Sequence, residues 1–129
     1  MDEITNAINT FFNSLKCENI LHYNIQNTSY PFENVFVLTC LSPRHVEACS
    51  DDFQKFVKDN KDQFFGELAQ KTKNNKIFAI DGTKTDGWVV VELKNKGIVA
   101  HFFTEEARKI YNIETHLERM KQIVISTNN

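Results

Sequence analysis

Residues 34–49 read NVFVLTCLSPRHVEAC, and this stretch decides the fold. Residues 35–40 form a continuous run of β-branched, aromatic and other apolar side chains, which predicts a central strand buried on both faces. Ser42 and Pro43 then supply a helix N-cap and a proline at the first helical position. The helix that follows is expected to reach about Asn60 with its apolar side chains on one face. A buried strand followed by an amphipathic helix indicates a sheet with helices packed on it.

The hydrophobic pattern predicts further elements on both sides of this stretch. Residues 2–15 place apolar side chains at helical spacing, and residues 20–25 alternate apolar and polar residues as a half-buried strand does. The remaining predictions are a short helix at 62–71 and strands at 77–80, 88–93 and 98–103. Asp81 and Gly82 predict a turn, and Gly97 is expected to take the special dihedral of the loop that makes the last two strands a hairpin.

The C-terminal part of the chain predicts one more helix. Thr104 is expected to cap it, and the helix is expected to bend near Asn112 and to resume to about Ile125. The order of elements predicts an α/β (α+β) fold with a single mixed sheet of about five strands and helices packed on it. We expect one domain over residues 1–129, with a frayed tail at 126–129.

Composition and charge limit the classes of protein to which the chain can belong. The 129 residues weigh 15.0 kDa, are 41% hydrophobic and 25% charged, and have a formal net charge of −2. Those values favour one soluble globular domain and disfavour a strongly basic protein that coats nucleic acid. No apolar stretch approaches the ~20 residues that span a bilayer, and the acidic N-terminus resembles neither a signal peptide nor a transit peptide. We therefore expect a bacterial cytoplasmic protein, with an organellar origin left open.

The nucleophilic and metal-ligating residues form no pattern that indicates catalysis. Cys17, Cys40 and Cys49 are an odd set without a disulfide framework, so reduced thiols are expected. We expect none of the four histidines to pair with a cysteine or another histidine at the short spacings of metal motifs. The sequence also holds no phosphate-binding loop and no nucleophile elbow. We therefore predict that the protein is not an enzyme and uses no metal or other cofactor.

Three blocks of sequence follow one another in an order that carries information. The first is SPRHVEA at 42–48, directly after the buried strand, and the second is Asp81-Gly82 ahead of Trp88. The third consists of WVVVE at 88–92, IVAHFF at 98–103, EAR at 106–108 and YNIE at 111–114. Together, over about residues 15–117, these blocks resemble the ribosomal silencing factor family, also called Iojap-like or DUF143 proteins.

The chain departs from the family pattern at several places, so it resembles a divergent member. Asn34 stands where the family has an aspartate, Leu41 where it has a glycine, and Leu117 where it has an aromatic residue. Residues 60–76 look like an insertion relative to the family. Lysines 71, 73 and 76 in that insertion are candidates for contact with ribosomal RNA, although a charge run of this kind is usually a solvated loop.

The resemblance implies a fold and a function without catalysis. Family members have a nucleotidyltransferase-like α/β sandwich that lacks the catalytic carboxylates. They act as translational repressors that bind the large ribosomal subunit at its universal protein fourteen, with adjacent ribosomal RNA as a further contact. Occupation of that surface sterically blocks joining of the small subunit. The resemblance also implies a homodimer as a further assembly, and neither a membrane nor DNA is expected as a partner.

The resemblance also marks a set of candidate partner-binding residues, and each has a structural alternative. The candidates are Trp88, Glu92, His101, Phe103, Arg108, Tyr111, Glu114 and Arg44. For the aromatic residues, packing in the core competes with a role as interface anchors. A hydrogen-bonded structural role is favoured for His101, and an outward-facing strand position is favoured for Glu92. Arg44 is a cation in the first turn of a helix, an unfavourable position that indicates a specific partner.

Two other classes of function stay open. A nucleotidyltransferase-like protein acting on nucleotide or RNA would need at least two carboxylates that converge on a metal ion. Its donors would be Asp51, Asp52, Asp81 and Glu92, which do not fit the Gly-Ser plus Asp-x-Asp pattern of that family. The third class is an interaction module for another protein partner. Metal-dependent nucleotide binding would separate the enzyme from both binding proteins.

Overall fold

The predicted central strand is β2 (Asn34–Cys40), and all seven of its residues are buried. It leads into α2 (Pro43–Asp59), whose N-cap Ser42 accepts a hydrogen bond from the backbone amide of His45 through its side chain. The predicted cap and helix are therefore confirmed. The cap fixes the first turn of α2 directly beyond the carboxyl end of the central strand.

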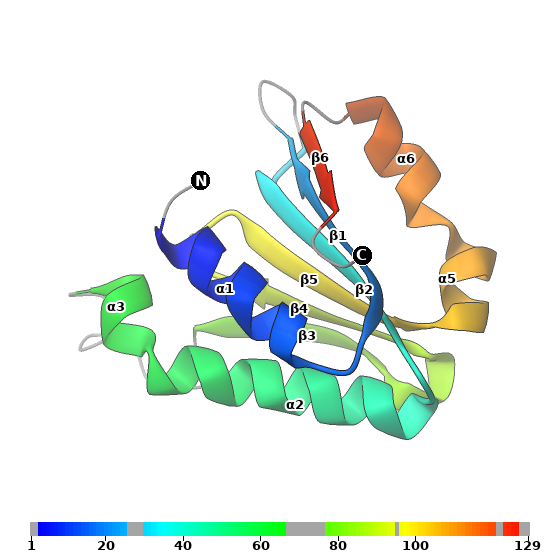
Figure 1. The fold of residues 1–129 in the computed structure, drawn as a ribbon, viewed down its shortest axis with the longest axis horizontal. Coiled ribbons are helices and arrows are strands. Elements are labelled where there is room, and N and C mark those ends of the chain that lie inside the picture. The colour runs from blue at the N-terminus through cyan, green and yellow to red at the C-terminus, as the bar shows by residue number, and fades with distance from the viewer. Residues whose placement is uncertain (1–2, 26–29, 67–76, 95, 121–122, 127–129) are drawn as a thin grey trace.

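The structure is a computed structural model that describes residues 3–25, 30–66, 77–94, 96–120 and 123–126 (Figure 1). The elements before the gap at 67–76 are α1 (Glu3–Ser14), β1 (Glu18–Asn24), β2, α2 and α3 (Lys61–Phe65). The elements after it are β3 (Phe78–Thr83), the 3-10 helix η2 (Lys84–Asp86), β4 (Trp88–Leu93), β5 (Ile98–Thr104), α5 (Glu105–Tyr111), α6 (Ile113–Met120) and β6 (Ile123–Ser126). Most of the predicted insertion and lysines 71, 73 and 76 lie outside the described residues.

In the described part of the chain, six strands form one mixed sheet in the order β3-β4-β5-β2-β1-β6. The central pair β2 and β5 is parallel, with Val37 opposite His101, and the other neighbouring pairs are antiparallel. This sheet, with helices packed on it, confirms the predicted α+β class. The central strand β2 is buried on both faces, as its apolar run at 35–40 predicts, and the parallel strand β5 is buried as well except at Thr104.

The prediction was wrong at the C-terminus, where a strand replaces the end of the expected helix. The bend at Asn112 is confirmed, with a left-handed φ of 44°. However, α6 ends at Met120, and residues 123–126 form β6, which pairs with β1 as a sixth strand. Three successive β-branched residues favour an extended chain, and the pairing covers what would otherwise be an open sheet edge. The strand includes Ser126, the first residue of the predicted frayed tail, and residues 127–129 lie outside the described part.

The predicted turn at Asp81-Gly82 is also wrong, because β3 runs through both residues and pairs with β4. The chain reverses instead through η2 and Gly87. Gly82 has a φ of +83°, and a Cβ atom there would lie 2.1 Å from the carbonyl oxygen of Trp88. This glycine therefore permits a close approach of two strands, a role that its sequence context does not distinguish from a turn.

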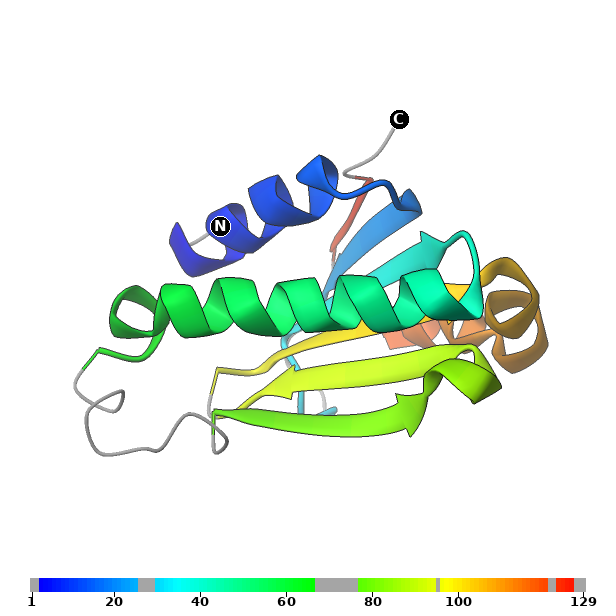
Figure 2. The same ribbon diagram turned by 90° about the horizontal axis from the view of Figure 1, so that it is seen from below.

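Helices cover the two faces of the sheet unequally (Figure 2). On one face, α1 and α2 bury a cluster that includes Phe12, Phe53 and Phe102. On the other face, α5 and α6 contribute Ala107 and Leu117 to a smaller cluster over β1, β2 and β5. No described helix covers the part of this second face formed by β3 and β4, which we call the open face. No helix in the described part of the chain is long and apolar enough to cross a membrane.

Candidate partner-binding surface

The alternation of β4 and β5 places several predicted residues on the second face of the sheet, on the open face and on the strand β5 beside it. In β4, the half-buried residues Trp88, Val90 and Glu92 alternate with fully buried ones. In the pairing with β5, Trp88 lies opposite Phe103 and Val90 lies opposite His101, so these side chains share one face. Trp88, Glu92, His101 and Phe103 are thereby gathered on two adjacent strands.

Trp88 is the centre of an aromatic cluster on this face. Its indole Nε1–H donates a hydrogen bond of 3.1 Å to Nδ1 of His101. Its ring lies 4.9 Å from the ring of Phe103 and 4.6 Å from that of Tyr111, measured between centroids. The first two contacts tie Trp88 to β5, and the third ties it to the end of α5. Trp88 is thus half-buried and packs partly in the core, and its role as an interface anchor stays a prediction.

His101 is buried and uncharged at neutral pH. Only 8% of the residue is exposed, and burial lowers the pKa of its imidazole to about 4. Because Nδ1 accepts from Trp88, the proton of the neutral ring lies on Nε2. This Nε2 is buried and has no hydrogen-bond partner among the described residues. An unpaired buried donor costs stability, and such groups concentrate at functional sites.

Two concavities flank Trp88. A hollow of about 410 Å³ lies on the open face between β3, β4, β5 and the segment that precedes β2; its lining includes Ile80, Glu92 and His101. A groove of about 500 Å³ lies at the carboxyl ends of β2 and β5, where Ile110 and Tyr111 of α5 line it. Trp88 contacts His101 on one side and Tyr111 on the other, so it stands between the hollow and the groove.

The exposed apolar side chains of the described residues gather at these two concavities. Leu41, Ile80, Ile110 and Tyr111 are 65%, 52%, 76% and 47% exposed, and they are the exposed large hydrophobic residues of this part of the chain. Ile80 lines the hollow, and the other three line the groove. We call the hollow, Trp88 and the groove together the aromatic strip. An exposed apolar surface of this kind, centred on a tryptophan and a tyrosine, is typical of a protein-binding site.

Arg108 and Glu114 are engaged within the fold. The Arg108 guanidinium forms an ion pair with Glu114, and it also donates to the carbonyl oxygen of Asn19 at 2.7 Å and to Oγ1 of Thr39 at 2.6 Å. Only 10% of the Arg108 side chain is exposed. These bonds join α5 to β1, β2 and α6, so a partner contact through Arg108 would compete with the fold itself. Glu105, three residues before Arg108 on α5, instead forms a surface ion pair with Lys109.

Arg44 lies apart from the other candidates. It is exposed in the first turn of α2 and forms no hydrogen bond or ion pair with the described residues. Its neighbour Pro43 lines the groove of the aromatic strip, which puts Arg44 at the margin of that strip. The structure therefore leaves the guanidinium available to a partner, and it identifies no internal carboxylate for it.

The three positions that depart from the family pattern have different surroundings. Asn34 is buried, and its side-chain oxygen accepts hydrogen bonds from His22 and Asn24 at 2.7 and 3.1 Å. Leu117 is 1% exposed and belongs to the smaller core cluster. Leu41 alone is exposed and lines the groove. A change of partner affinity caused by these substitutions is therefore expected from Leu41 first.

The carboxylates of the alternative enzyme are divided between the two faces of the sheet. Asp51 and Asp52 are exposed on α2, which covers one face, whereas Asp81 and Glu92 line the hollow on the other. Within the described residues, the group of three potential metal ligands that does form contains no carboxylate. Asp81 and Glu92 therefore share the hollow without a third potential ligand beside them to complete a metal site for nucleotidyl transfer.

Two features escaped the sequence predictions. Exposure of Ile80 and Ile110 was not foreseen, because an isoleucine in an amphipathic element is assigned to the core by default. The statement that no histidine pairs with a cysteine at short spacing is also wrong. His45 and Cys49 are four residues apart on α2, which is one helical turn, and their side chains meet. The spacing of four residues between His45 and Cys49 is the feature of the sequence that could have predicted this contact.

The fold defines the class of protein as an α+β domain with a mixed sheet, and solved structures share it. A protein from Chromobacterium violaceum has a TM-score of 0.69 and 20% sequence identity, with 92% of this chain and 88% of that chain covered. A protein from Bacillus halodurans has a TM-score of 0.64 and 17% identity, with 89% and 94% covered. At these identities the likeness concerns the fold alone.

Sequence comparison then identifies the family. A family model described as "Ribosomal silencing factor during starvation" (RsfS) matches residues 1–128. Ribosomal silencing factor RsfS of Haemophilus influenzae is 27% identical over 100 residues, which cover 78% of this chain and 83% of that protein. The chain therefore belongs to the ribosomal silencing factor family, whose role is ribosome-associated silencing and not enzymatic. The predicted family and the prediction that the protein is not an enzyme are confirmed.

Proposed function

We propose that this protein represses translation by binding the large ribosomal subunit at its universal protein fourteen, through the aromatic strip, and so blocks joining of the small subunit. Membership of the family supports the ribosomal role. The resemblance of the sequence to the family supplies the particular subunit and the particular protein. The aromatic strip supplies a surface on which such a contact could form. The mechanism is steric and needs no catalytic residue.

One observation carries the choice of surface: the exposed large hydrophobic residues of the described part all line the aromatic strip. A free domain loses nothing by replacing such side chains with polar ones, so their clustering favours a surface that a partner buries. Trp88 and Tyr111 touch each other in the middle of the strip. Tryptophan and tyrosine near the centre of an interface carry a large share of binding energy in other complexes.

The dimensions of the molecule agree with a one-sided interface. The accessible surface of the structure is 7447 Å². A protein interface of standard size buries ~800 Å² of each partner, about a tenth of this surface. One strip is therefore sufficient for specific binding, and α1 and α2 on the opposite face can remain in solvent. A body of 15.0 kDa held on the joining surface of one subunit would then collide with the other.

The hollow adds a polar component to this surface. Glu92 lines the hollow with a carboxylate, whereas the Nε2–H of the neutral His101 is buried behind its surface. A partner that presents a cation there would pair with Glu92. Binding of this type would be specific in addition to apolar, because a misplaced partner would leave buried polar groups unpaired.

The test is co-sedimentation of the purified protein with isolated large and small subunits at physiological salt. The wild-type protein is expected to pellet with the large subunit only and to slow subunit joining measured by light scattering. Ile110→Ser, at a highly exposed position, is expected to weaken binding about tenfold, and Trp88→Ala more strongly. Lys55→Ser, at an exposed position on α2, is the matched control and should bind as the wild type does.

Two outcomes would contradict the proposal. Wild-type protein that remains in the supernatant with both subunits would remove ribosome binding as the function of this surface. Equal weakening by Ile110→Ser and Lys55→Ser would place the contact elsewhere. A pull-down with purified universal protein fourteen then tests the particular partner. Self-association through the strip would bury Trp88 as well, so a homodimer is expected to compete with ribosome binding.

A further inference from the structure

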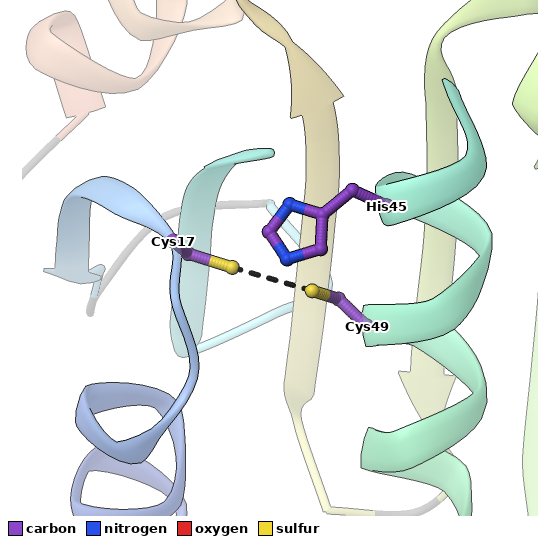
Figure 3. Close-up of side chains that lie close together, drawn as sticks. All are labelled: Cys17, His45 and Cys49. Atoms are coloured by element: carbon purple, nitrogen blue, oxygen red, sulfur yellow. Dashed lines mark hydrogen bonds between the residues drawn. The ribbon is translucent and has the colours of Figure 1, made fainter. Parts of the chain in front are cut away.

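A group of sulfur and nitrogen ligands lies on the helix-covered face, away from the aromatic strip. His45 and Cys49 project from adjacent turns of α2, and Cys17 projects from the segment between α1 and β1 (Figure 3). The ligand atoms of these three residues all lie within 4.8 Å of one another. Figure 3 shows the imidazole ring pointing toward the two sulfur atoms, which are 3.4 Å apart.

The local structure explains why these side chains meet. Ser42 caps the first turn of α2, and the backbone amide of Leu41 donates to Nδ1 of His45 at 2.9 Å. This bond orients the imidazole and leaves Nε2 for the side of the ring that faces the sulfurs. Cys17 and Cys49 are almost fully buried, whereas His45 is partly exposed at the outer end of the group. The two sulfur atoms of the group are therefore buried, and the imidazole lies on the side of the group that faces solvent.

The spacing of the sulfurs fits a tetrahedral metal ion. A Zn–S bond of ~2.3 Å at a tetrahedral angle separates two sulfurs by ~3.8 Å. The separation of 3.4 Å between Cys17 and Cys49 reaches this value with a movement of a few tenths of an ångström. The thiol of Cys40 lies 3.9 Å from that of Cys17 and extends the sulfur-rich wall. Two cysteines with one histidine form a donor set that zinc accepts and that hard cations such as Mg²⁺ do not prefer.

The chemistry of the ligands defines what binding of a metal would do to their protons. The thiolate is the form of cysteine that binds metals. Arrival of a dication would release the thiol protons of Cys17 and Cys49 to solvent and leave two thiolates and a neutral imidazole around the ion.

We propose that Cys17, His45 and Cys49 form a binding site for one zinc ion, with water in the fourth tetrahedral position. This site goes beyond the proposed function, because steric blocking of subunit joining uses no metal. The ion would pin the segment between α1 and β1 to the first turns of α2. It would therefore stabilise the helix-covered face, since ligands that bind only the folded state raise its stability.

Coordination through Nε2 makes a specific structural demand. The proton of the imidazole must move to Nδ1, so the hydrogen bond from the Leu41 amide to Nδ1 must break. Leu41 is 65% exposed, which lets this amide turn to water. The amide resonance of Leu41 in a nitrogen-15 correlation spectrum is therefore expected to shift when zinc is added. A metal held by the two cysteines alone would not require that change.

The experiment uses the full chain kept reduced and titrated with zinc in competition with a chromophoric chelator. Wild-type protein is expected to bind one zinc ion per chain and, with cobalt in its place, to show a thiolate charge-transfer band in the near ultraviolet. Cys49→Ser is expected to weaken zinc binding at least about 100-fold, and His45→Ala at least about tenfold. His116→Ala, which removes an exposed histidine of α6, is the matched control and should bind zinc as the wild type does.

Because Cys49 is buried, Cys49→Ser requires a circular dichroism spectrum to establish that it folds. If Cys49→Ser does not fold, His45→Ala tests the zinc site instead, because His45 is partly exposed. The proposal is overturned if the wild-type protein shows no charge-transfer band, or if His45→Ala binds zinc as tightly as the wild type. It is also overturned if His116→Ala weakens binding as much as His45→Ala does. None of these measurements involves the ribosome, so failure of the metal site is distinguishable from failure of the proposed function.

Discussion

The two faces of the sheet use aromatic side chains in opposite ways. On the helix-covered face, Phe12, Phe53 and Phe102 are fully buried and pack with ring centroids 4.9 to 6.0 Å apart. On the open face, Trp88 and Tyr111 pack on each other while a part of each remains exposed. The phenylalanines have no polar atom, whereas the tryptophan and the tyrosine each carry a hydrogen-bonding group at the ring edge. The comparison separates a face that holds the fold from a face that is available to a partner.

The largest difference between the faces is expected in the free energy of unfolding. Phe102→Ala removes a ring that contacts Phe12 and Phe53 and leaves a cavity, so it is expected to lower the free energy of unfolding by about 3–5 kcal/mol. Ile110→Ser removes an exposed side chain and should change it by less than about 0.5 kcal/mol. Urea denaturation of both variants measures the two values. A cost above about 2 kcal/mol for Ile110→Ser would show that the strip is part of the core, and the comparison would fail.

Substitution of Arg108 tests whether this residue stabilises the fold or belongs to the partner-binding surface. Arg108→Met keeps the length of the side chain but removes the bonds to Glu114, Asn19 and Thr39, so we expect a loss of about 2–3 kcal/mol in the free energy of unfolding. Lys109→Met is the control, because the pair of Lys109 with Glu105 is exposed and should contribute less than about 0.5 kcal/mol. The readout is again the urea midpoint. If Arg108→Met is as stable as Lys109→Met but loses ribosome binding, Arg108 belongs to the partner-binding surface after all.

The same contrast explains which parts of the fold could be predicted from sequence. The buried run of β2, the Ser42 cap and the bend at Asn112 are set by neighbouring residues, so local rules were sufficient for them. The strand β6 was missed because its partner β1 lies about 100 residues away in the chain, and only the assembled sheet supplies the open edge. Gly82 was misassigned for a similar reason, since the strand that approaches it belongs to a later segment.

The candidate site divides in the same way. Trp88, Glu92, His101 and Phe103 lie on one face because side chains alternate along a strand, and this rule can be applied to a sequence. Sequence alone could not reveal that Arg108 turns inward, because its acceptors on β1 and β2 come from segments about 70 to 90 residues away. Exposure of Ile80 and Ile110 depends on where the helices end over the sheet. That is a property of the tertiary structure, and no local pattern encodes it.

The smallest expected effect concerns a proton on the open face. The pKa of His101 is about 4 in the folded protein and ~6.5 in an unfolded chain, so the unfolded state binds more protons between these values. The free energy of unfolding therefore falls as the pH is lowered through this window, by about 2 kcal/mol between pH 7 and pH 5. The glutamine of His101→Gln cannot take up that proton. The free energy of unfolding of this variant should therefore fall by about 2 kcal/mol less than that of the wild type between pH 7 and pH 5. Asp81 and Glu92, which line the same hollow, are present in both proteins, so their contribution is common to both and cancels in the difference.

Urea midpoints of the wild-type protein and His101→Gln at pH 7, 6 and 5 measure this difference. His116→Gln serves as the matched control, because His116 is exposed and its removal should leave the pH dependence of the wild type intact. An unchanged slope in His101→Gln would mean that His101 takes up a proton in the folded protein as readily as in the unfolded chain. The imidazole would then carry a charge below a pH of about 6.5, and that charge would require an acceptor at Nε2. Below that pH the open face would favour an anionic partner, and its contrast with the apolar helix-covered face would become one of charge.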